Sequence, residues 1–128
     1  MKQREQARLF LRKAAEDEAL LDEVIGSSRV SDAVFGFHCQ QGAEKLLKAL
    51  LSEIGVVFRR THDLTELCDL LADAGHALPP ELADVDALTP YAVTFRYADD
   101  ATFAPLDRES IRQLLRALRS HVEGGIAS

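Results

Sequence analysis

The sequence predicts an all-α protein, an antiparallel up-and-down bundle of four or five helices. The 128 residues are 47% apolar and include no Trp and few β-branched side chains, which favours helices over a sheet. Apolar side chains recur with a helical period over long segments. Capping residues and glycines mark the ends of these segments. A chain of this length can bury a real core, so we expect a single domain over residues 1–128.

The two longest helices are predicted in the first half of the chain. The first runs from about Lys2 to Ile25 and ends at Gly26-Ser27-Ser28. Ser31 is placed to cap the second helix, and Gly55 is placed to end it. Because only a short turn separates these two segments, we expect them to pack antiparallel.

A third helix is predicted after the apolar link Val56-Val57-Phe58, which we expect to cover the end of the bundle. Asp63 is its predicted cap. Glu66 stands three residues later, an arrangement like a capping box. The helix is expected to end at Gly75.

Two short segments and one long helix follow. Pro79-Pro80 opens a short segment through Leu88, and Pro90 restarts a helix toward Tyr97. Asp107 caps the last predicted helix, which ends at Gly124-Gly125.

Composition excludes several classes of protein. The net charge of −6 argues against broad, charge-driven binding to nucleic acid, although a small basic site remains compatible with it. The apolar runs are too short for a membrane span, and the N-terminus opens into a charged amphipathic helix without a secretory signal. Cys39 and Cys68 lie at apolar helix positions without metal-ligand spacing, so we expect no metal and no cofactor. These features predict a cytoplasmic protein.

The second predicted helix carries an unusual polar face. On a helical wheel its apolar side contains Phe35, Cys39, Ala43, Leu46, Leu47, Leu50 and Ile54. The opposite side contains His38, Gln41, Lys45, Lys48 and Ser52. Gln40 and Glu44 fall between the two sides, where side chains are half-buried against a neighbouring helix. Lys45 and Lys48 are close enough to contact one anion. The alternative is a solvated face stabilised by a Glu44–Lys48 pair.

A local concentration of positive and titratable side chains continues beyond this helix, at Arg59, Arg60 and His62. It is compatible with a nucleotide or a short RNA as ligand. The alternatives are structural: His62 anchors the loop by bonding to local backbone, and Arg60 pairs with Asp63 or Glu66.

Three landmarks in this order resemble the HEPN family, the higher eukaryotes and prokaryotes nucleotide-binding domain. They are His38-x-Gln40-Gln41-x-Ala43-Glu44-Lys45-x-Leu47-Lys48-Ala49, Thr61-His62-Asp63-Leu64 and Arg96-Tyr97-x-Asp99. The resemblance implies an antiparallel helical bundle, usually a homodimer. It also implies pairing with a minimal nucleotidyltransferase of the DNA polymerase β-like type, as in toxin–antitoxin modules.

The polar face and the landmarks together give the candidate ligand-binding residues for a nucleotide or for RNA phosphate and base. They are His38, Gln41, Lys45, Lys48, Arg60, His62, Arg96 and Tyr97. Tyr97 is the candidate to stack on a base, and Arg96 the candidate to contact a phosphate. The structural alternative for Arg96 is an ion pair with Asp99 or Asp100.

Some members of this family resemble metal-independent ribonucleases that use an Arg-x4–6-His motif. In such a site an imidazole takes the 2′-hydroxyl proton while a guanidinium stabilises the phosphorane. No His follows Arg96 at this spacing, and the formal match from Arg116 to His121 places its side chains roughly 140° apart. We therefore predict no catalytic residues. A nucleotide-binding partner subunit is favoured over an endoribonuclease toxin, and a purely structural interaction module is the third alternative.

Apolar side chains near the polar face predict self-association. Leu50 and Leu51 lie on the broad apolar side of the second helix, and Phe37 lies toward its polar flank. This excess of apolar surface is expected to be buried across a homodimer interface.

Overall fold

The computed structural model describes residues 2–94 and 105–126, all of whose regular elements are helical. In chain order these are α1 (Lys2–Val24), α2 (Asp32–Glu53), α3 (Leu64–Asp73), the 3-10 helix η1 (Pro80–Leu88), α4 (Tyr91–Thr94) and α5 (Arg108–Gly124). The predicted all-α bundle is confirmed. None of the helices in the described residues combines the length and apolar character needed to cross a membrane.

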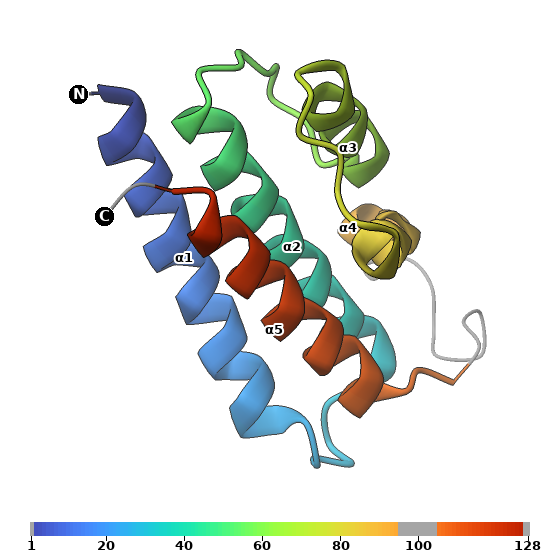
Figure 1. Ribbon diagram of the computed structural model, residues 1–128. Coiled ribbons are helices and arrows are strands. Elements are labelled where there is room, and N and C mark those ends of the chain that lie inside the picture. Colours follow the sequence, from blue (N-terminus) through green and yellow to red (C-terminus); the bar gives the residue numbers. More distant parts are fainter. Residues whose placement is uncertain (1, 95–104, 127–128) are drawn as a thin grey trace.

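Three long helices, α1, α2 and α5, lie side by side (Figure 1). The predicted antiparallel packing of α1 and α2 is confirmed, and this pair makes the most extensive contact in the bundle. The chain returns through α3, η1 and α4 on the other side of α2, so that α5 runs in the same direction as α2. The start of α1 and the end of α5 therefore lie at the same end of the bundle, with α2 in the centre.

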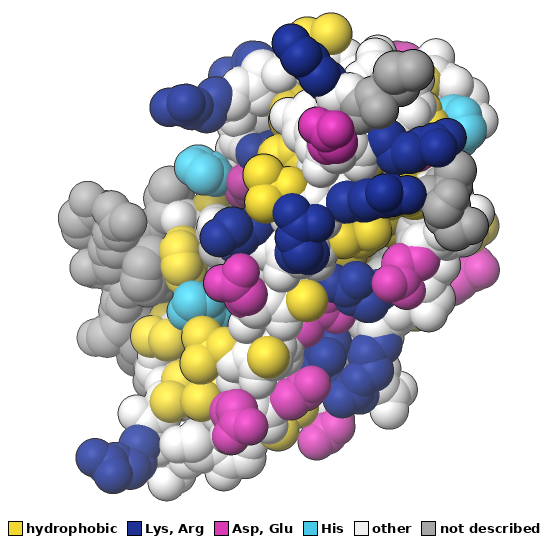
Figure 2. Space-filling view, turned by 90° about the vertical axis from the view of Figure 1, so that its left-hand side faces the viewer, with side chains coloured by type: hydrophobic (Ala, Val, Ile, Leu, Met, Phe, Trp, Pro, Cys, Tyr) yellow, Lys and Arg dark blue, Asp and Glu magenta, His cyan; other side chains and the backbone are white. Residues whose placement is uncertain are grey.

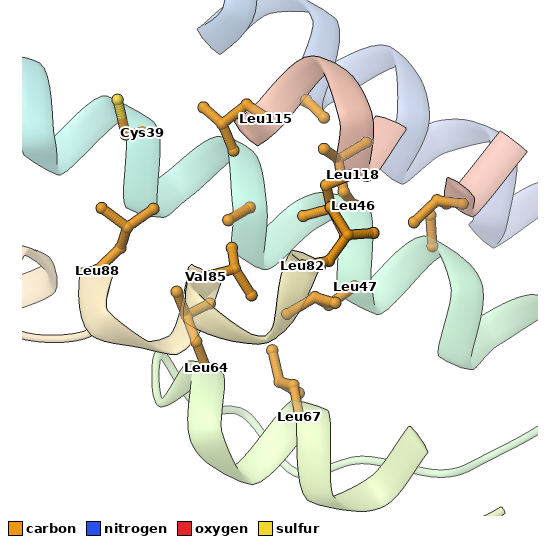
Figure 3. Packing of buried hydrophobic residues seen from close by; sticks show 14 of the residues in the cluster. Cys39, Leu46, Leu47, Leu64, Leu67, Leu82, Val85, Leu88, Leu115 and Leu118 are labelled. Carbon is orange, nitrogen blue, oxygen red and sulfur yellow. The ribbon is translucent and has the colours of Figure 1, made fainter. Parts of the chain in front are cut away.

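The hydrophobic core surrounds α2 (Figure 3). Leucines and a valine from three elements form one cluster with Cys39, Leu46 and Leu47 of α2; they are Leu64, Leu67, Leu82, Val85, Leu88, Leu115 and Leu118. Leu50 and Leu51 are also part of this core, with 3% and 0% of their surface exposed. The expectation that they form a dimer interface is wrong, because the surrounding helices of the same chain already bury them.

Close packing on α2 depends on Gly36. A Cβ atom at this position would lie 2.3 Å from Cδ1 of Tyr91, well inside the van der Waals contact distance. The missing side chain lets the Tyr91 ring, at the start of α4, lie directly against the helix.

Most of the predicted capping residues lie at the ends of the observed helices. Ser31 accepts a hydrogen bond from the Val34 amide, and Asp107 accepts one from the Ser110 amide. Asp63 accepts from the Thr65 and Glu66 amides. Gly55 and Gly75 have φ angles of +80° and +83°, the left-handed conformation expected after a helix.

The link between α2 and α3, residues 55–62, differs from expectation in two respects. Val57 is 91% exposed, so the apolar link covers the bundle only through Val56 and Phe58. Glu66 does not close a capping box, because its carboxylate binds the Arg59 guanidinium at 2.6 Å. The arginine that pairs with Glu66 is thus Arg59 and not Arg60.

Charged side chains join α1 to α5 in what we call the α1–α5 network. The Arg112 side chain is only 6% exposed; its Nε lies 2.6 Å from Asp22 and its Nη1 3.4 Å from Glu18. Arg119 Nη2 lies 2.6 Å from the second oxygen of Glu18 and donates to the Leu11 carbonyl. The hydrogen bond from Arg112 holds the pKa of Asp22 below its ordinary value of 3.8.

Arg108, the first residue of α5, closes the turn between α1 and α2. Its guanidinium donates to the backbone carbonyls of Val24, Ile25, Ser27 and Val30. Its Nε also donates to Asp32 at 2.8 Å. One guanidinium from α5 thus serves several carbonyl groups of this turn; the Val24 carbonyl also accepts from the Ser27 amide.

Candidate functional site

Only one strip of α2 remains uncovered by its neighbours. Between residues 33 and 52, the side chains that are not buried are Val34, Phe37, His38, Gln41 and Lys45. We call these residues the open strip. It contains three of the predicted site residues. Figure 2 shows the side of the molecule formed by α1, where histidine, lysine and arginine side chains lie beside hydrophobic ones.

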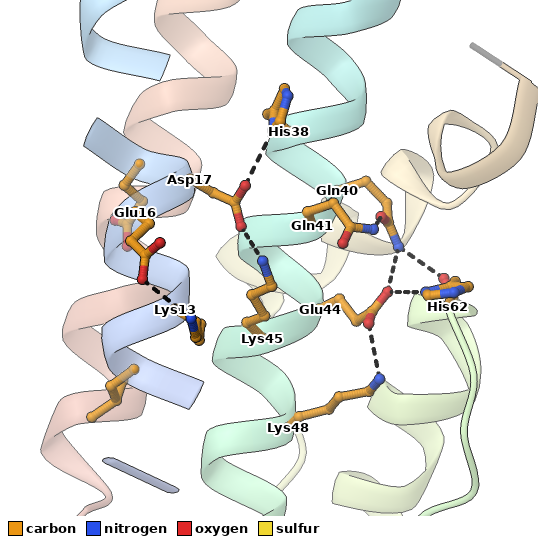
Figure 4. A network of polar contacts seen from close by, with 12 residues as sticks. Lys13, Glu16, Asp17, His38, Gln40, Gln41, Glu44, Lys45, Lys48 and His62 are labelled. Atoms are coloured by element: carbon orange, nitrogen blue, oxygen red, sulfur yellow. Dashed lines mark hydrogen bonds and ion pairs between the residues drawn. The ribbon is translucent and has the colours of Figure 1, made fainter. Parts of the chain in front are cut away.

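A buried carboxylate on α1 holds two residues of the open strip (Figure 4). Asp17 Oδ1 lies 3.1 Å from His38 Nδ1, and Asp17 Oδ2 lies 2.6 Å from Lys45 Nζ. The Asp17 side chain is 11% exposed, whereas those of His38 and Lys45 are 28% and 27% exposed. The acid thus lies beneath the surface and fixes two side chains that reach it.

A second buried carboxylate, Glu44, organises the neighbouring part of the surface. Its Oε1 lies 2.8 Å from His62 Nδ1 and accepts from Gln40 Nε2, and its Oε2 lies 2.8 Å from Lys48 Nζ. Gln40 Nε2 also donates to the His62 carbonyl at 2.9 Å, which fixes the backbone as well as the ring. Gln41 on the open strip donates to Gln40 Oε1 at 2.7 Å, so the two sets of contacts adjoin.

These contacts leave His62 oriented but accessible. Its side chain is 58% exposed, and no described residue bonds to its Nε2 atom. His62 does anchor the link, as one sequence interpretation expected, but its ring bonds to a carboxylate on α2 and not to local backbone. When Nδ1 donates to a carboxylate, Nε2 of the neutral ring becomes an acceptor, and it becomes a donor when the ring is protonated.

The C-terminal half of the predicted polar face is buried. Lys48 and Ser52 are 8% and 3% exposed, so the expectation that they share a solvated face with Lys45 is wrong. The helical wheel could not anticipate that the link folds back over them. Lys48 Nζ lies 5.8 Å from the centre of the Phe58 ring. Because Lys45 and Lys48 each bind a different carboxylate, they do not present one shared anion site.

The other predicted site residues fall in different places. Arg60 is exposed and makes no ion pair with a described residue. Arg96 and Tyr97 lie outside the described residues. Arg116 lies 3.3 Å from Asp22 of α1.

His121, by contrast, lines a surface hollow of about 370 Å³ together with His76 and Leu50. The prediction that Arg116 and His121 face different neighbours is therefore confirmed.

Asp17 is the residue that sequence reasoning missed. A signal for it was present, because Asp17 lies on the side of α1 that carries the buried Ala14 and Leu21. An acid on a buried helix face implies a partner that compensates its charge. The identity of that partner depends on how α1 is rotated against α2, which the periodicity of one helix does not determine.

The cysteines and carboxylates do not form a metal centre in the described residues, where no group of three or more potential ligands is placed to hold an ion. Burial raises the pKa of the Cys39 thiol to about 12 and that of Cys68 to about 11. Both thiols are therefore protonated at neutral pH and serve as small packing groups.

Comparison with known proteins now gives the family. The family model described as "HEPN domain" matches residues 7–123, which include Asp17, Glu44 and His62. Searches among curated proteins and among solved structures found no match. The family match spans most of the chain and all of the contacts described above. The chain therefore belongs to the HEPN domain family, a group of helical modules of the nucleotide-binding or ribonuclease type.

Proposed function

We propose that this protein binds a nucleotide or a short RNA and acts as the partner subunit of a minimal nucleotidyltransferase in a toxin–antitoxin-like system. The observation that carries the proposal is the pair of histidines, His38 and His62, each held through Nδ1 by a buried carboxylate. Groups fixed in this way lose little conformational freedom when a ligand binds. Family membership supports the same class of function.

The groups that reach the surface match the chemistry of a phosphate. The carboxylates of Asp17 and Glu44 are buried and already bound by protein side chains. Lys45, Gln41 and Arg60 carry N–H donors that are at least partly exposed. Phosphate oxygens accept hydrogen bonds from such donors. We assign Lys48 a positioning role, since it binds Glu44 beneath the surface. The overall charge of −6 confines the attraction to this local site, so binding should weaken as salt rises.

Calorimetric titration with ATP, other nucleotides and short RNA tests the proposed ligand. We expect Lys45→Ala and Arg60→Ala to weaken binding and to reduce its salt dependence. Arg12→Ala is the matched control, because Arg12 is an exposed arginine of α1 that contacts neither carboxylate. Failure of the unmodified protein to bind any of these ligands would contradict the proposal.

We also propose a cytoplasmic homodimer, since domains of this family often form dimers. Apolar side chains that are not buried favour this assembly: Val34 of the open strip is 38% exposed, Phe37 of the same strip is half-buried, and Leu20 of α1 is 39% exposed. Light scattering at micromolar concentration tests it. A species of 14.1 kDa would show a monomer and exclude the dimer.

The nucleotidyltransferase partner is tested by purification of the protein from its native host. Mass analysis of bound proteins and nucleotides should identify a minimal nucleotidyltransferase. Recovery of the protein without any such subunit would contradict the partnership, while leaving ligand binding to the calorimetric test.

Endoribonuclease activity remains the alternative function. An acid–base pair must converge on one phosphodiester, whereas Arg116 faces α1 and His121 lies beside His76 and Leu50. We expect that the purified protein does not cleave RNA with or without EDTA. Metal-independent cleavage that His121→Ala abolishes would establish the ribonuclease instead.

A further inference from the structure

A small cavity is lined by residues from the N-terminal end of α1, the C-terminal end of α2 and the link that follows α2. Its volume is about 200 Å³. The residues around it include Gln3, Gln6, Ser52, Val56, Val57 and Phe58.

Part of the cavity lining is apolar and aromatic. Phe58 is half-buried and is held from two directions, by the Phe10 ring at 6.2 Å and by Lys48 Nζ at 5.8 Å from the ring centre. Val57 is 91% exposed at the same place. An aliphatic side chain in water beside a fixed aromatic ring offers surface that a flat apolar ligand would cover.

The rest of the lining includes polar groups that have no hydrogen-bond partner among the described residues. The amides of Gln3 and Gln6 are exposed and make no hydrogen bond to a described residue. The hydroxyl of Ser52 is buried and also has no hydrogen-bond partner in the part of the chain that the structure describes. Buried hydroxyl groups are normally paired, so a polar ligand group in the cavity would supply a partner for the hydroxyl of Ser52.

The size and chemistry of the cavity select one kind of ligand. An apolar protein cavity of about 150 Å³ holds benzene, whereas pockets for drug-sized molecules span ~300–1,000 Å³. The volume here is therefore close to that of one planar heterocycle. A glutamine amide supplies one acceptor and a donor group, the pairing that a nucleobase edge matches, and an aromatic ring supplies a stacking surface.

We propose that this cavity is a nucleobase subsite, formed by Gln3, Gln6, Ser52 and Phe58. This subsite rests on the proposed nucleotide-binding function. It adds a second region to the exposed donors Lys45, Gln41 and Arg60, which we call the phosphate surface. Phe58, Arg60 and His62 occupy alternate positions of one link, so each neighbouring pair is at most ~7 Å apart along the backbone. A base against Phe58 would place its ribose phosphate within reach of the Arg60 side chain.

NMR titration of the full chain separates the two regions. Adenosine, guanosine, cytidine and uridine carry a base without a phosphate, and ribose 5-phosphate carries a phosphate without a base. We expect at least one nucleoside to shift the amide signals of Val56 and Val57 in a saturable manner. Ribose 5-phosphate should instead shift the signals of Arg60 and His62.

Side-chain variants then test the cavity itself. The double variant Gln3→Ala/Gln6→Ala should weaken nucleoside binding about fivefold or more, the effect of losing one net hydrogen bond, and leave ribose 5-phosphate binding unchanged. Both glutamines are exposed, so the fold should not be affected. Phe58→Leu should weaken the same ligands, and Gln113→Ala, at an exposed position of α5, is the matched control.

Two results would overturn the subsite. One is the absence of saturable nucleoside binding at Val56 and Val57; the other is nucleoside binding that both cavity variants leave intact. Either result would leave the phosphate surface standing if ribose 5-phosphate or ATP still binds. Loss of phosphate binding alone, with nucleoside binding kept, would instead contradict the proposed function and retain the cavity.

Discussion

Two neighbouring acids on α1, Asp17 and Glu18, are both buried but serve different regions of the molecule. Glu18 faces α5, where Arg112 and Arg119 bind it. Asp17 faces α2, where it binds His38 and Lys45. The partners of Glu18 make further contacts inside the protein, whereas those of Asp17 are each more than a quarter exposed. The α1–α5 network thus holds helices together. The contacts of Asp17, by contrast, orient the His38 and Lys45 side chains toward solvent.

The largest loss of stability should come from breaking the α1–α5 network. Arg112→Ala would leave Glu18 and Asp22 without their shared buried partner, and breaking a buried ion pair costs about 3–5 kcal/mol. Urea unfolding followed by circular dichroism measures this loss. The control is Arg116→Ala, which also removes a partner of Asp22 but at a half-exposed position; it should cost about 1 kcal/mol or less. Equal losses for the two variants would contradict the distinction.

A somewhat smaller loss of stability is expected when the buried Glu44–Lys48 pair is broken. Glu44→Ala leaves the Lys48 ammonium buried without its counter-ion and should cost about 3 kcal/mol. The double variant Glu44→Ala/Lys48→Met removes both charges and should regain much of this stability. It should not regain phosphate binding, because His62 has lost the acceptor that orients it. Recovery of both properties in calorimetry would show that orientation of His62 is unimportant.

A fall in pH should weaken the α1–α5 network. The hydrogen bond from Arg112 lowers the pKa of Asp22 below its ordinary value of 3.8. At pH values above 3.8, the ionised Asp22 therefore stabilises the folded state. That stability is lost as pH falls below 3.8 through the lower folded value. The loss should be about 1 kcal/mol or less, since the side chain is 48% exposed. Urea unfolding at a series of pH values should show a shallower acid dependence for Asp22→Asn than for the unmodified protein.

The smallest change in stability is expected for His62→Ala. Its ring is 58% exposed, so the free energy of unfolding should change by about 1 kcal/mol or less. Nucleotide binding should nevertheless weaken, which separates a surface role from a structural one. His76→Ala, at an exposed position after α3, should alter neither property. Unfolding and calorimetry on the same samples distinguish these outcomes.

Local sequence signals were sufficient to predict most of the fold. The caps at Ser31, Asp63 and Asp107 depend on contacts within three residues, so they can be read from the chain itself. The wheel also placed His38, Gln41 and Lys45 on the side of α2 that is open.

What could not be predicted depends on packing between distant segments. The link covers Lys48, and Arg59 rather than its neighbour reaches Glu66. Arg112 is buried on a helix whose pattern gives no sign of the acids on α1 that bind it. Each of these contacts depends on a rotation or a loop path that no single helix specifies.

The contacts of Arg108 have a consequence for the order of folding during synthesis. The α1–α2 hairpin can form as soon as its own residues have left the ribosome, because its helices contact each other directly. The carbonyls of Val24, Ile25 and Ser27, however, receive their guanidinium only after about eighty further residues have been made. We expect the turn of the nascent hairpin to stay loose and to become rigid only when α5 docks.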